Sequence, residues 1–288
     1  MGNHVSFIAE VSSNHSKDIN RCYAFIDAAA DAGCDVVKFQ LFRIDKLFAH
    51  EILERSEVHR KRKEWELPLE FLPLLYERCK QKQIKFSCTP FYLEAVDELY
   101  PYVDFYKVAS YELLWDDLMI ACAKTGKPVI ISTGMATIPE IQHAVEVLRS
   151  NGCTDIKVLH CTSSYPTPFT EANLSAMNTI AKATGCLVGW SDHTVQPGVI
   201  QRAVHKYGAC EVEFHLDLDG KGEEYATGHC WLPNEIGTVI RDVRVAMQSD
   251  GNGVKEPVPS ELSDRLWRAD PSDGLRPFKS IRENYHPN

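Results

Sequence analysis

The feature that most constrains the fold of this chain is a repeated alternation of short apolar runs with longer segments of helical period, from the first residues to about Gln248. Short β-rich runs bounded by Gly, Pro or polar residues predict buried strands. Eight such runs in about 250 residues are typical of a (β/α)8 barrel and exceed what an open doubly wound sheet normally holds. We therefore predict an α/β protein with the TIM-barrel architecture and strands at 5–10, 35–40, 84–89, 104–109, 128–133, 156–161, 187–191 and 211–215.

The segments between these strands carry apolar residues at helical spacing. They predict helices at 20–32, 67–82, 115–124, 138–149, 173–184, 199–207 and 233–247. Segment 42–65 is longer than an ordinary strand-to-helix connection and rich in charge, so we expect it to cover the barrel mouth or pack outside it, with its charges in solvent. After Ser249 the sequence becomes rich in Gly, Pro and charge. We expect one barrel domain over 1–250 and a tail over 251–288 without a second folded domain.

Charge and cysteine usage narrow the classes of partner and compartment. The 288 residues include 31 Lys plus Arg and 40 Asp plus Glu, a formal net charge of −9. This balance argues against electrostatic binding of nucleic acid or of an anionic membrane. The ten cysteines form no Cys-x-x-Cys pair, which favours buried, reduced thiols over a disulfide or zinc scaffold. Because no secretory signal or transmembrane span is visible, we expect a cytoplasmic protein.

Polar side chains accumulate where the predicted strands end. In barrel enzymes the reacting groups come from the carboxyl ends of several strands. One polar strand end is commonly a loop start or a helix cap, but here all eight strands end in this way. The residues are Glu10, Lys38, Gln40, Thr89, Lys107, Ser110, Ser132, Thr133, His160, Thr162, Ser163, Ser191, Asp192, His193, Glu213 and His215.

Two lysines in this set, Lys38 and Lys107, predict a site for phosphate at the barrel mouth. Ammonium groups supply charge there, and the neighbouring Ser and Thr residues supply short donors. The alternative is that each lysine pairs with a barrel carboxylate, for which Glu10, Glu112 and Glu213 are available. The two interpretations are compatible, because one ammonium group can contact both.

Two histidines, His193 and His215, follow neighbouring strands and should lie within reach of one divalent ion. Glu10, Asp192 or Glu213 would be available as further ligands. The same imidazoles would serve equally well as structural hydrogen-bonding groups. Their spacing alone leaves both roles open.

Many of these residues stand within longer motifs. The motifs are Ile8-Ala9-Glu10, Val37-Lys38-Phe39-Gln40, Thr89-Pro90-Phe91, Lys107-Val108-Ala109-Ser110-Tyr111-Glu112, Ile131-Ser132-Thr133-Gly134-Met135-Ala136-Thr137, His160-Cys161-Thr162-Ser163-Ser164-Tyr165-Pro166-Thr167-Pro168 and Ser191-Asp192-His193-Thr194. In order and spacing they resemble the sialic acid synthase (NeuB) family over about residues 5–260. Together they are highly specific.

The resemblance implies a (β/α)8 barrel that condenses phosphoenolpyruvate with the aldehyde of an open-chain amino sugar such as N-acetylmannosamine. The products would be a nine-carbon 2-keto-3-deoxy acid and phosphate. A divalent metal, Mn²⁺ or Mg²⁺, is held in the family at the positions that match His193 and His215. The family also implies a homodimer. Its phosphoenolpyruvate-binding positions match Lys38, Thr89, Lys107, Ser110, Ser132, Ser163 and Ser191.

The chemistry of this reaction suggests further roles. A Lewis acid on the aldehyde oxygen would stabilise the alkoxide that develops as the carbon–carbon bond forms. Glu10 and Glu213, with Lys38, are the candidates for the catalytic proton transfers. For the sugar we expect contacts from Gln40, Tyr165 and Asp217.

Two departures from the family pattern affect the binding sites. The family often has Asn near positions 163 and 164, where this chain has Ser163-Ser164. The loop after the eighth strand normally contains Pro-Asp-His and helps to bind the sugar. Here it offers other polar residues, namely Asp217, Asp219, Glu224 and His229.

A third departure concerns the C-terminal segment. Typical relatives carry an antifreeze-like domain whose arginine touches the N-acyl group in the partner subunit's site, whereas about thirty residues follow the barrel linker here. Arg265, Arg268 and Arg276 are candidates for the missing guanidinium. These departures leave two alternatives: the same condensation with a phosphorylated or differently substituted aldose, or a non-catalytic barrel that binds sugar phosphates. The combination of anion-binding lysines and metal-ligating histidines favours an enzyme.

Overall fold

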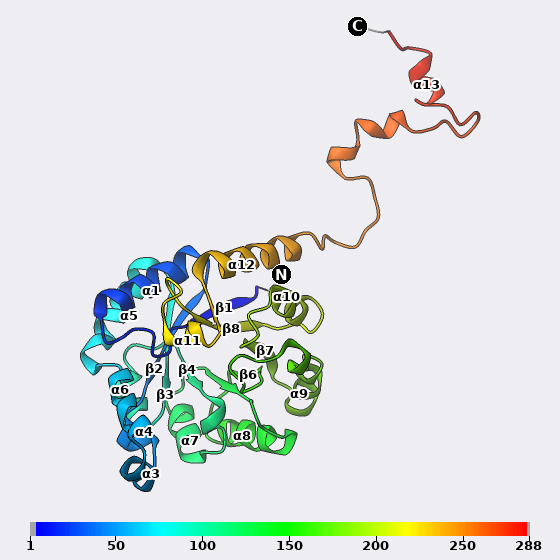
Figure 1. Cartoon of the computed structure of the whole chain (residues 1–288). Helices are drawn as coiled ribbons and strands as arrows, with labels where there is room; N and C mark the ends of the chain where they lie inside the picture. Colours follow the sequence, from blue (N-terminus) through cyan, green and yellow to red (C-terminus); the bar gives the residue numbers. More distant parts are fainter. Residues whose placement is uncertain (1–3, 287–288) are drawn as a thin grey trace. The chain divides into compact units, whose positions relative to one another are not determined.

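The protein was analysed as a computed structural model that describes residues 4–286. By its internal contacts the chain divides into one unit that ends at Met247 and a second that begins at Gln248. The first unit is a closed barrel of eight parallel strands, because β1 pairs with both β2 and β8 (Figure 1). The strands are β1 (Ser6–Glu10), β2 (Val36–Leu41), β3 (Lys85–Pro90), β4 (Phe105–Val108), β5 (Val129–Ser132), β6 (Ile156–His160), β7 (Leu187–Asp192) and β8 (Glu211–Leu216). The predicted TIM-barrel fold is confirmed.

Helices surround the strands. The main ones are α1 (Ile19–Asp31), α5 (Leu72–Lys82), α6 (Glu94–Leu99), α7 (Asp116–Lys124), α8 (Ile138–Ser150), α9 (Ala176–Thr184), α10 (Pro197–His205) and α12 (Pro233–Gln248). Several begin at the expected signals: Asp18 caps α1, and the Glu140 carboxylate accepts a hydrogen bond from the Thr137 amide at the start of α8. The sequence analysis did not predict α6, whose six residues are too few to show a helical period.

Two layers of apolar side chains form the core. The larger layer lies between the strands and the helices and contains, among others, Phe7, Phe39 and Trp190. The smaller one fills the barrel interior with Ile8, Val36, Phe105, Ile130 and Leu159. Side chains alternate between these layers along each strand, as strand geometry requires. Gly189 has no side chain because a Cβ there would lie 2.5 Å from the Leu159 side chain.

Strand register places polar side chains above the interior apolar layer. Glu10 pairs in register with Lys38 of β2 and with His215 of β8, and Ser191 pairs with Glu213. At the opposite, amino-terminal end of the strands, Lys157 forms an ion pair with Glu211. The barrel therefore carries ionic groups at both ends, separated by the apolar interior.

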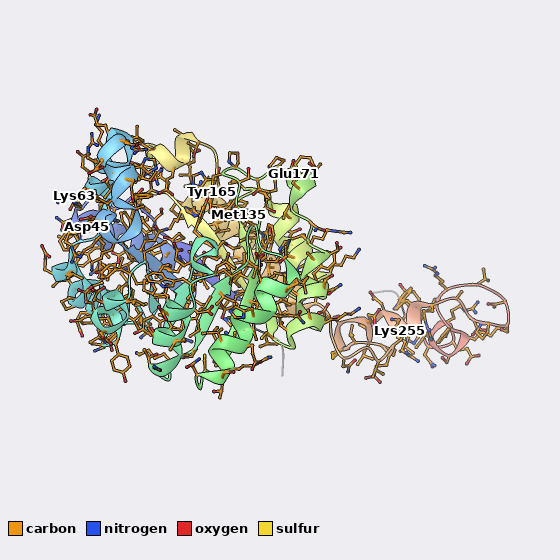
Figure 2. The ribbon with its side chains drawn as sticks, turned by 90° about the horizontal axis from the view of Figure 1, so that it is seen from below. Asp45, Lys63, Met135, Tyr165, Glu171 and Lys255 are labelled. Atoms are coloured by element: carbon orange, nitrogen blue, oxygen red, sulfur yellow. The ribbon has the colours of Figure 1, made fainter. Side chains whose placement is uncertain are left out.

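Two long connections rise over the carboxyl ends of the strands. The first, after β2, contains α2 (Ile44–Leu47), α3 (His50–Arg55), α4 (Glu57–Lys61) and the 3-10 helix η1 (Arg62–Trp65); the second, after β8, contains α11 (Glu223–Ala226) and the short strand β9 (Cys230–Trp231). Asp45 and Lys63 of the first connection are labelled in Figure 2 together with Tyr165 of the loop after β6.

Shorter elements complete the description. In the first unit these are the 3-10 helices η2 (Leu69–Phe71), η3 (Ser110–Glu112) and η4 (Phe169–Glu171). In the second unit they are the 3-10 helices η5 (Pro259–Glu261) and η6 (Asp264–Trp267) and the helix α13 (Lys279–Arg282). Among residues 4–286 there is no helix with the length and apolar character needed to cross a bilayer.

Candidate active site

A pocket opens at the carboxyl ends of the strands, and most of the predicted site residues line it. Its walls come from seven strands of the barrel and from the loop that follows β6, which explains why no single sequence segment defines it. Ser163 and Asp217, both predicted to bind substrate, are outside its lining. The lining residues are Glu10, Lys38, Gln40, Thr89, Phe91, Lys107, Ala109, Ser110, Tyr111, Ser132, Cys161, Tyr165, Ser191, His193, Glu213 and His215.

The centre of the pocket is a buried carboxylate, Glu213, between two lysines. The Nζ atoms of Lys38 and Lys107 lie 3.7 and 3.6 Å from its Oε1, and the Ser191 hydroxyl donates to the same oxygen at 3.4 Å. Burial alone would raise the pKa of Glu213, but the positive charges of Lys107 and Lys38 outweigh it and lower this pKa. Glu213 is therefore an ionised carboxylate.

Lys38 links this carboxylate to a second one, Glu10. Its ammonium group forms an ion pair with Glu10 and donates to the Thr89 hydroxyl at 3.1 Å. Burial lowers the pKa of Lys38 to about 8, against the opposing effect of Glu213. Glu10 also accepts hydrogen bonds from the Ser12 amide at 2.6 Å and from Gln40 Nε2 at 3.2 Å. The lysines thus have carboxylate partners, as the alternative interpretation of the sequence expected.

Hydroxyl groups without partners mark space for an anion. The hydroxyl oxygens of Ser132 and Ser163 are buried, and neither has a hydrogen-bond partner within residues 4–286. Ser110 accepts a hydrogen bond from the Gly134 amide at 3.0 Å, and a Cβ on Gly134 would come within 2.1 Å of Ser163 Oγ. Gly134 therefore lets Ser163 approach Ser110, although Ser163 does not line the pocket itself. Buried donors normally have acceptors, so this wall is suited to a bound oxyanion.

Two imidazoles face each other at the edge of the pocket, with ring centroids of His193 and His215 5.4 Å apart. His193 Nδ1 is hydrogen-bonded to the Thr162 carbonyl oxygen at 2.9 Å. His215 Nδ1 is hydrogen-bonded to the Glu224 carboxylate, also at 2.9 Å. Burial lowers the pKa of His193 to about 3, so its imidazole is neutral and can act as a metal ligand. Neither Nε2 atom makes a hydrogen bond to another of the residues 4–286, so both can bind a ligand, an arrangement that fits a divalent cation.

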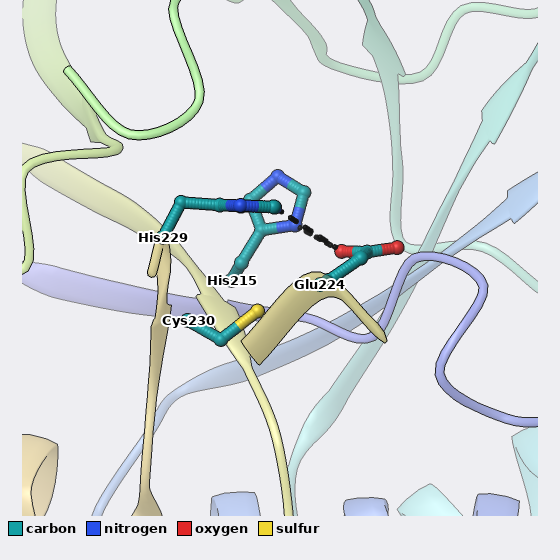
Figure 3. A group of neighbouring side chains, drawn as sticks. All are labelled: His215, Glu224, His229 and Cys230. Atoms are coloured by element: carbon teal, nitrogen blue, oxygen red, sulfur yellow. Dashed lines mark hydrogen bonds and ion pairs between the residues drawn. The ribbon is translucent and has the colours of Figure 1, made fainter. Parts of the chain in front are cut away.

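The loop after β8 adds residues that the sequence did not assign to this cluster. His215, Glu224, His229 and Cys230 offer ligand atoms within 4.8 Å of one another, and Figure 3 shows them side by side. The Glu224 carboxylate also lies 3.5 Å from His229 Nε2 and accepts from the Ser13 hydroxyl at 2.8 Å. Glu224 and His229 were candidates to replace sugar-binding residues, and the structure brings both of them next to the predicted metal ligand His215.

The three predicted sugar-binding residues have different environments. Gln40 and Tyr165 line the pocket, and the Tyr165 ring lies 4.3 Å from that of His193, centroid to centroid. Asp217 is fully buried, and its carboxylate accepts from Arg21 at 3.2 Å and from the Gly222 amide at 3.0 Å. Asp217 is thus occupied in fixing the loop after β8 and does not reach the pocket.

Glu112, which the sequence offered only as a lysine partner, lies above the pocket with a buried Oε2 that has no hydrogen-bond partner in the described residues. Burial raises its pKa to about 7, against the opposing effect of Lys107. Glu112 therefore changes charge near neutral pH, whereas neighbouring charges lower the pKa of Glu213 and hydrogen bonds from His215 and His229 lower that of Glu224.

The fold and the site together define a TIM-barrel enzyme whose pocket, at the carboxyl ends of the strands, is lined by ion-paired lysines, hydroxyl groups and, at its edge, imidazoles. A profile of the NeuB family matches residues 25–255. The chain belongs to the NeuB family. The prediction of a synthase in which phosphoenolpyruvate is condensed with a sugar is confirmed at this level.

Individual relatives and a solved structure agree with this assignment. An uncharacterised protein of Methanocaldococcus jannaschii is 38% identical over 256 residues, which cover 88% of this chain and 74% of that protein. The N,N'-diacetyllegionaminic acid synthase of Campylobacter jejuni is 35% identical to this chain, and the matched region covers 88% of this chain and 80% of that synthase. The N-acetylneuraminic acid synthetase of Leptospira borgpetersenii, solved with citrate, has a TM-score of 0.81 and 31% identity and covers 91% of this chain and 90% of its own.

Proposed function

We propose that this protein condenses phosphoenolpyruvate with the open-chain aldehyde of an N-acylated amino sugar and forms a sialic acid-type 2-keto-3-deoxy-nonulosonic acid and phosphate. The observation that carries the proposal is the convergence of Lys38, Lys107 and the unpartnered hydroxyl of Ser132 on one pocket whose edge holds His193 and His215. The names of the relatives above support a nine-carbon acid as the product.

In this proposal the pocket binds phosphoenolpyruvate first. The ammonium groups of Lys38 and Lys107 bind its anionic groups, and Ser132 and Ser163 donate the hydrogen bonds that they lack in the free protein. Thr89, Ser110 and Ser191 complete the anion site through the contacts described above. C3 of phosphoenolpyruvate then attacks the aldehyde carbon, water adds at C2, and the carbon–oxygen bond to phosphate breaks.

The proton transfers belong to the buried carboxylates. Glu213, held ionised by the lysines, can accept a proton from the water that adds at C2. Glu10 shares Lys38 with it, so protons can pass within this ion-paired group. A divalent ion, Mn²⁺ or Mg²⁺, bound by His193 and His215 would polarise the aldehyde oxygen. A domain over residues 1–250 supplies all of these groups; the homodimer and the cytoplasmic location stay predictions.

The test is phosphate release from phosphoenolpyruvate in the presence of Mn²⁺ with a panel of aldoses. The panel contains N-acetylmannosamine, its 6-phosphate, mannose and a 2,4-diacetamido-2,4,6-trideoxyhexose. We expect release with an N-acylated sugar and its loss when a chelator is added. Binding of phosphoenolpyruvate without release for any sugar would instead support a sugar-phosphate-binding barrel.

A further inference from the structure

A second pocket lies above the first and continues it outward. The two pockets share Gln40, Phe91, Ala109, Tyr111, Tyr165 and His215, so a molecule whose reacting end is in the inner pocket extends into the outer one. The remaining walls of the outer pocket come from the connections after β1, β2, β4 and β8. They are Ser12, Ser13, Phe42, Leu47, Phe48, Arg62, Trp65, Glu112, Glu224 and His229.

Arg62 stands out among these residues because, within the described part of the chain, its guanidinium contacts aromatic rings but no hydrogen-bond acceptor or anion. Its Cζ lies 5.5 Å from the ring centroids of both Phe48 and Trp65, and it makes no hydrogen bond or ion pair within residues 4–286. The Nε atom is buried. A buried guanidinium donor without an acceptor is unusual, because buried polar groups are nearly always hydrogen-bonded. The sequence analysis placed this charge on a solvated face; the structure places it in a pocket.

The backbone on either side of Arg62 is tied down. Lys17 Nζ donates to the Lys63 carbonyl at 2.7 Å, and the Glu66 carboxylate accepts from the Ile44 amide at 2.9 Å. The aromatic rings hold the guanidinium plane itself through cation–π contacts. Arg62 is thus a pre-organised donor, and a ligand that accepts from it need not order the side chain first.

The surroundings of Arg62 favour an uncharged acceptor group. Phe42, Leu47 and Phe91 contribute apolar surface to the same pocket, where a methyl group would be stabilised. The pocket's two carboxylates, Glu112 and Glu224, oppose a phosphate, and Arg62 is the one Lys or Arg side chain among the lining residues. A phosphate dianion would therefore face more negative than positive charge, whereas a neutral acyl carbonyl would not.

We propose that Arg62 is the residue of this chain that selects the acceptor: its guanidinium donates to the carbonyl of an acylamino substituent, and the outer pocket disfavours a phosphorylated sugar. The inference rests on the proposed function, since it concerns the second substrate of that reaction. The sequence had offered Arg265, Arg268 and Arg276 of the second unit as candidates for contact with the N-acyl group. The present inference assigns that contact to a residue of the connection after β2.

The experiment measures phosphate release for Arg62→Met and for a matched control, Lys61→Met. Methionine keeps an unbranched apolar stem between Phe48 and Trp65 and removes every donor. Lys61 is the neighbouring cation, with an exposed side chain that contacts only Glu57 among the described ion pairs. The acceptors are N-acetylmannosamine, its 6-phosphate, mannose and the diacetamido sugar, each at saturating phosphoenolpyruvate and Mn²⁺.

We expect Arg62→Met to lower kcat/KM for the acylated acceptors by roughly 10- to 100-fold, the usual effect of removing a hydrogen bond from a charged donor. Its kcat/KM for mannose and its KM for phosphoenolpyruvate should change by less than about threefold, and Lys61→Met should match the wild type throughout. The wild type should prefer the unphosphorylated acylated sugar.

Two outcomes would overturn the inference while leaving the proposed function intact. In the first, the wild type prefers the 6-phosphate and Arg62→Met removes that preference, which would make the guanidinium a phosphate ligand. In the second, Arg62→Met and Lys61→Met have equal effects on every acceptor. Absence of phosphate release with all four sugars would overturn the proposed function, and the inference with it.

Discussion

The inner and outer pockets differ in how their charges are balanced. In the inner pocket Lys38, Lys107, Glu10 and Glu213 neutralise one another at positions fixed by strand register. In the outer pocket the cation Arg62 has no such partner and comes from a long connection. A rigid, internally balanced site suits the steps of the reaction itself, whereas an unpaired group on a connection suits the choice of one substrate. The following predictions test this division.

The largest effect is expected for His215→Ala. Removing this imidazole takes away one predicted metal ligand and one of the partners of the Glu224 carboxylate. Because Lewis-acid stabilisation of the aldehyde is worth several kcal/mol, turnover should fall by at least about 1,000-fold. Phosphoenolpyruvate binding, measured by calorimetry, should weaken by less than about tenfold, since the lysines remain. Normal turnover with ordinary metal dependence would show that His215 is not a ligand.

Lys107→Ala should act on the other substrate. It removes one of two positive charges next to Glu213 and should weaken phosphoenolpyruvate binding by about 100-fold or more. It should also reduce the free energy of unfolding by about 3–5 kcal/mol, because a buried carboxylate loses a partner. Calorimetric titration and urea unfolding measure the two effects separately.

The barrel itself offers the matched control for that variant. Lys157→Ala breaks a comparable ion pair, with the buried Glu211, at the amino-terminal end of the strands. It should lower stability in the same way but leave phosphoenolpyruvate affinity unchanged. If both variants weaken binding equally, the loss reflects a general loosening of the barrel, and the inner pocket is not the anion site.

Glu224→Gln tests the boundary between the two pockets, because Glu224 lines the outer one and bonds to His215 at the edge of the inner one. A carboxylate behind a metal-binding histidine orients the ring and raises its basicity, and its loss typically costs 10- to 100-fold in metal affinity. We expect that range for Mn²⁺, with saturating Mn²⁺ restoring most of the turnover. A loss that added metal does not restore would mean that Glu224 acts mainly on the sugar.

The sequence predicted the inner pocket better than the outer one for a physical reason. All eight strands occur within a residue or two of their predicted bounds, and side-chain alternation then decides which residues face the barrel interior. Glu10, Lys38, Lys107 and Glu213 follow from that rule, because each is at an inward position near a strand's carboxyl end.

Residues on connections do not follow from any such period. In the sequence, Asp217 and Glu224 are both polar residues of a loop. In the structure, the Asp217 carboxylate accepts a hydrogen bond from Arg21, and the Glu224 carboxylate is hydrogen-bonded to His215. Arg62 stood in a run of charges whose usual place is solvent. Its contact with Phe48 depends on how the connection after β2 folds back from η1 to the residue that follows α2, which no short pattern in the sequence specifies.

The smallest effect concerns Glu112 and is expected in stability against pH. Its pKa is raised from 4.5 to about 7 in the folded protein, so the folded state keeps a proton that the unfolded chain has released. Stability is therefore lost as pH rises from about 4.5 to 7. Because Gln cannot ionise, Glu112→Gln should not lose this stability. Relative to the wild type, its free energy of unfolding should rise by roughly 1–3 kcal/mol between pH 4.5 and 8, as measured by urea unfolding.

Glu140→Gln is the control of opposite sign. The Glu140 carboxylate accepts from the Thr137 amide and hydroxyl at the start of α8, which lowers its pKa, so its contribution is present above pH 4.5 and the variant should lose stability there. The stabilities of the two variants, relative to the wild type, should therefore change with pH in opposite directions. If both changed in the same direction, Glu112 would be an ordinary solvated carboxylate. Glu112 lines the outer pocket together with Arg62, so it would then add a full negative charge there at neutral pH, and the exclusion of phosphorylated sugars would be stronger than proposed.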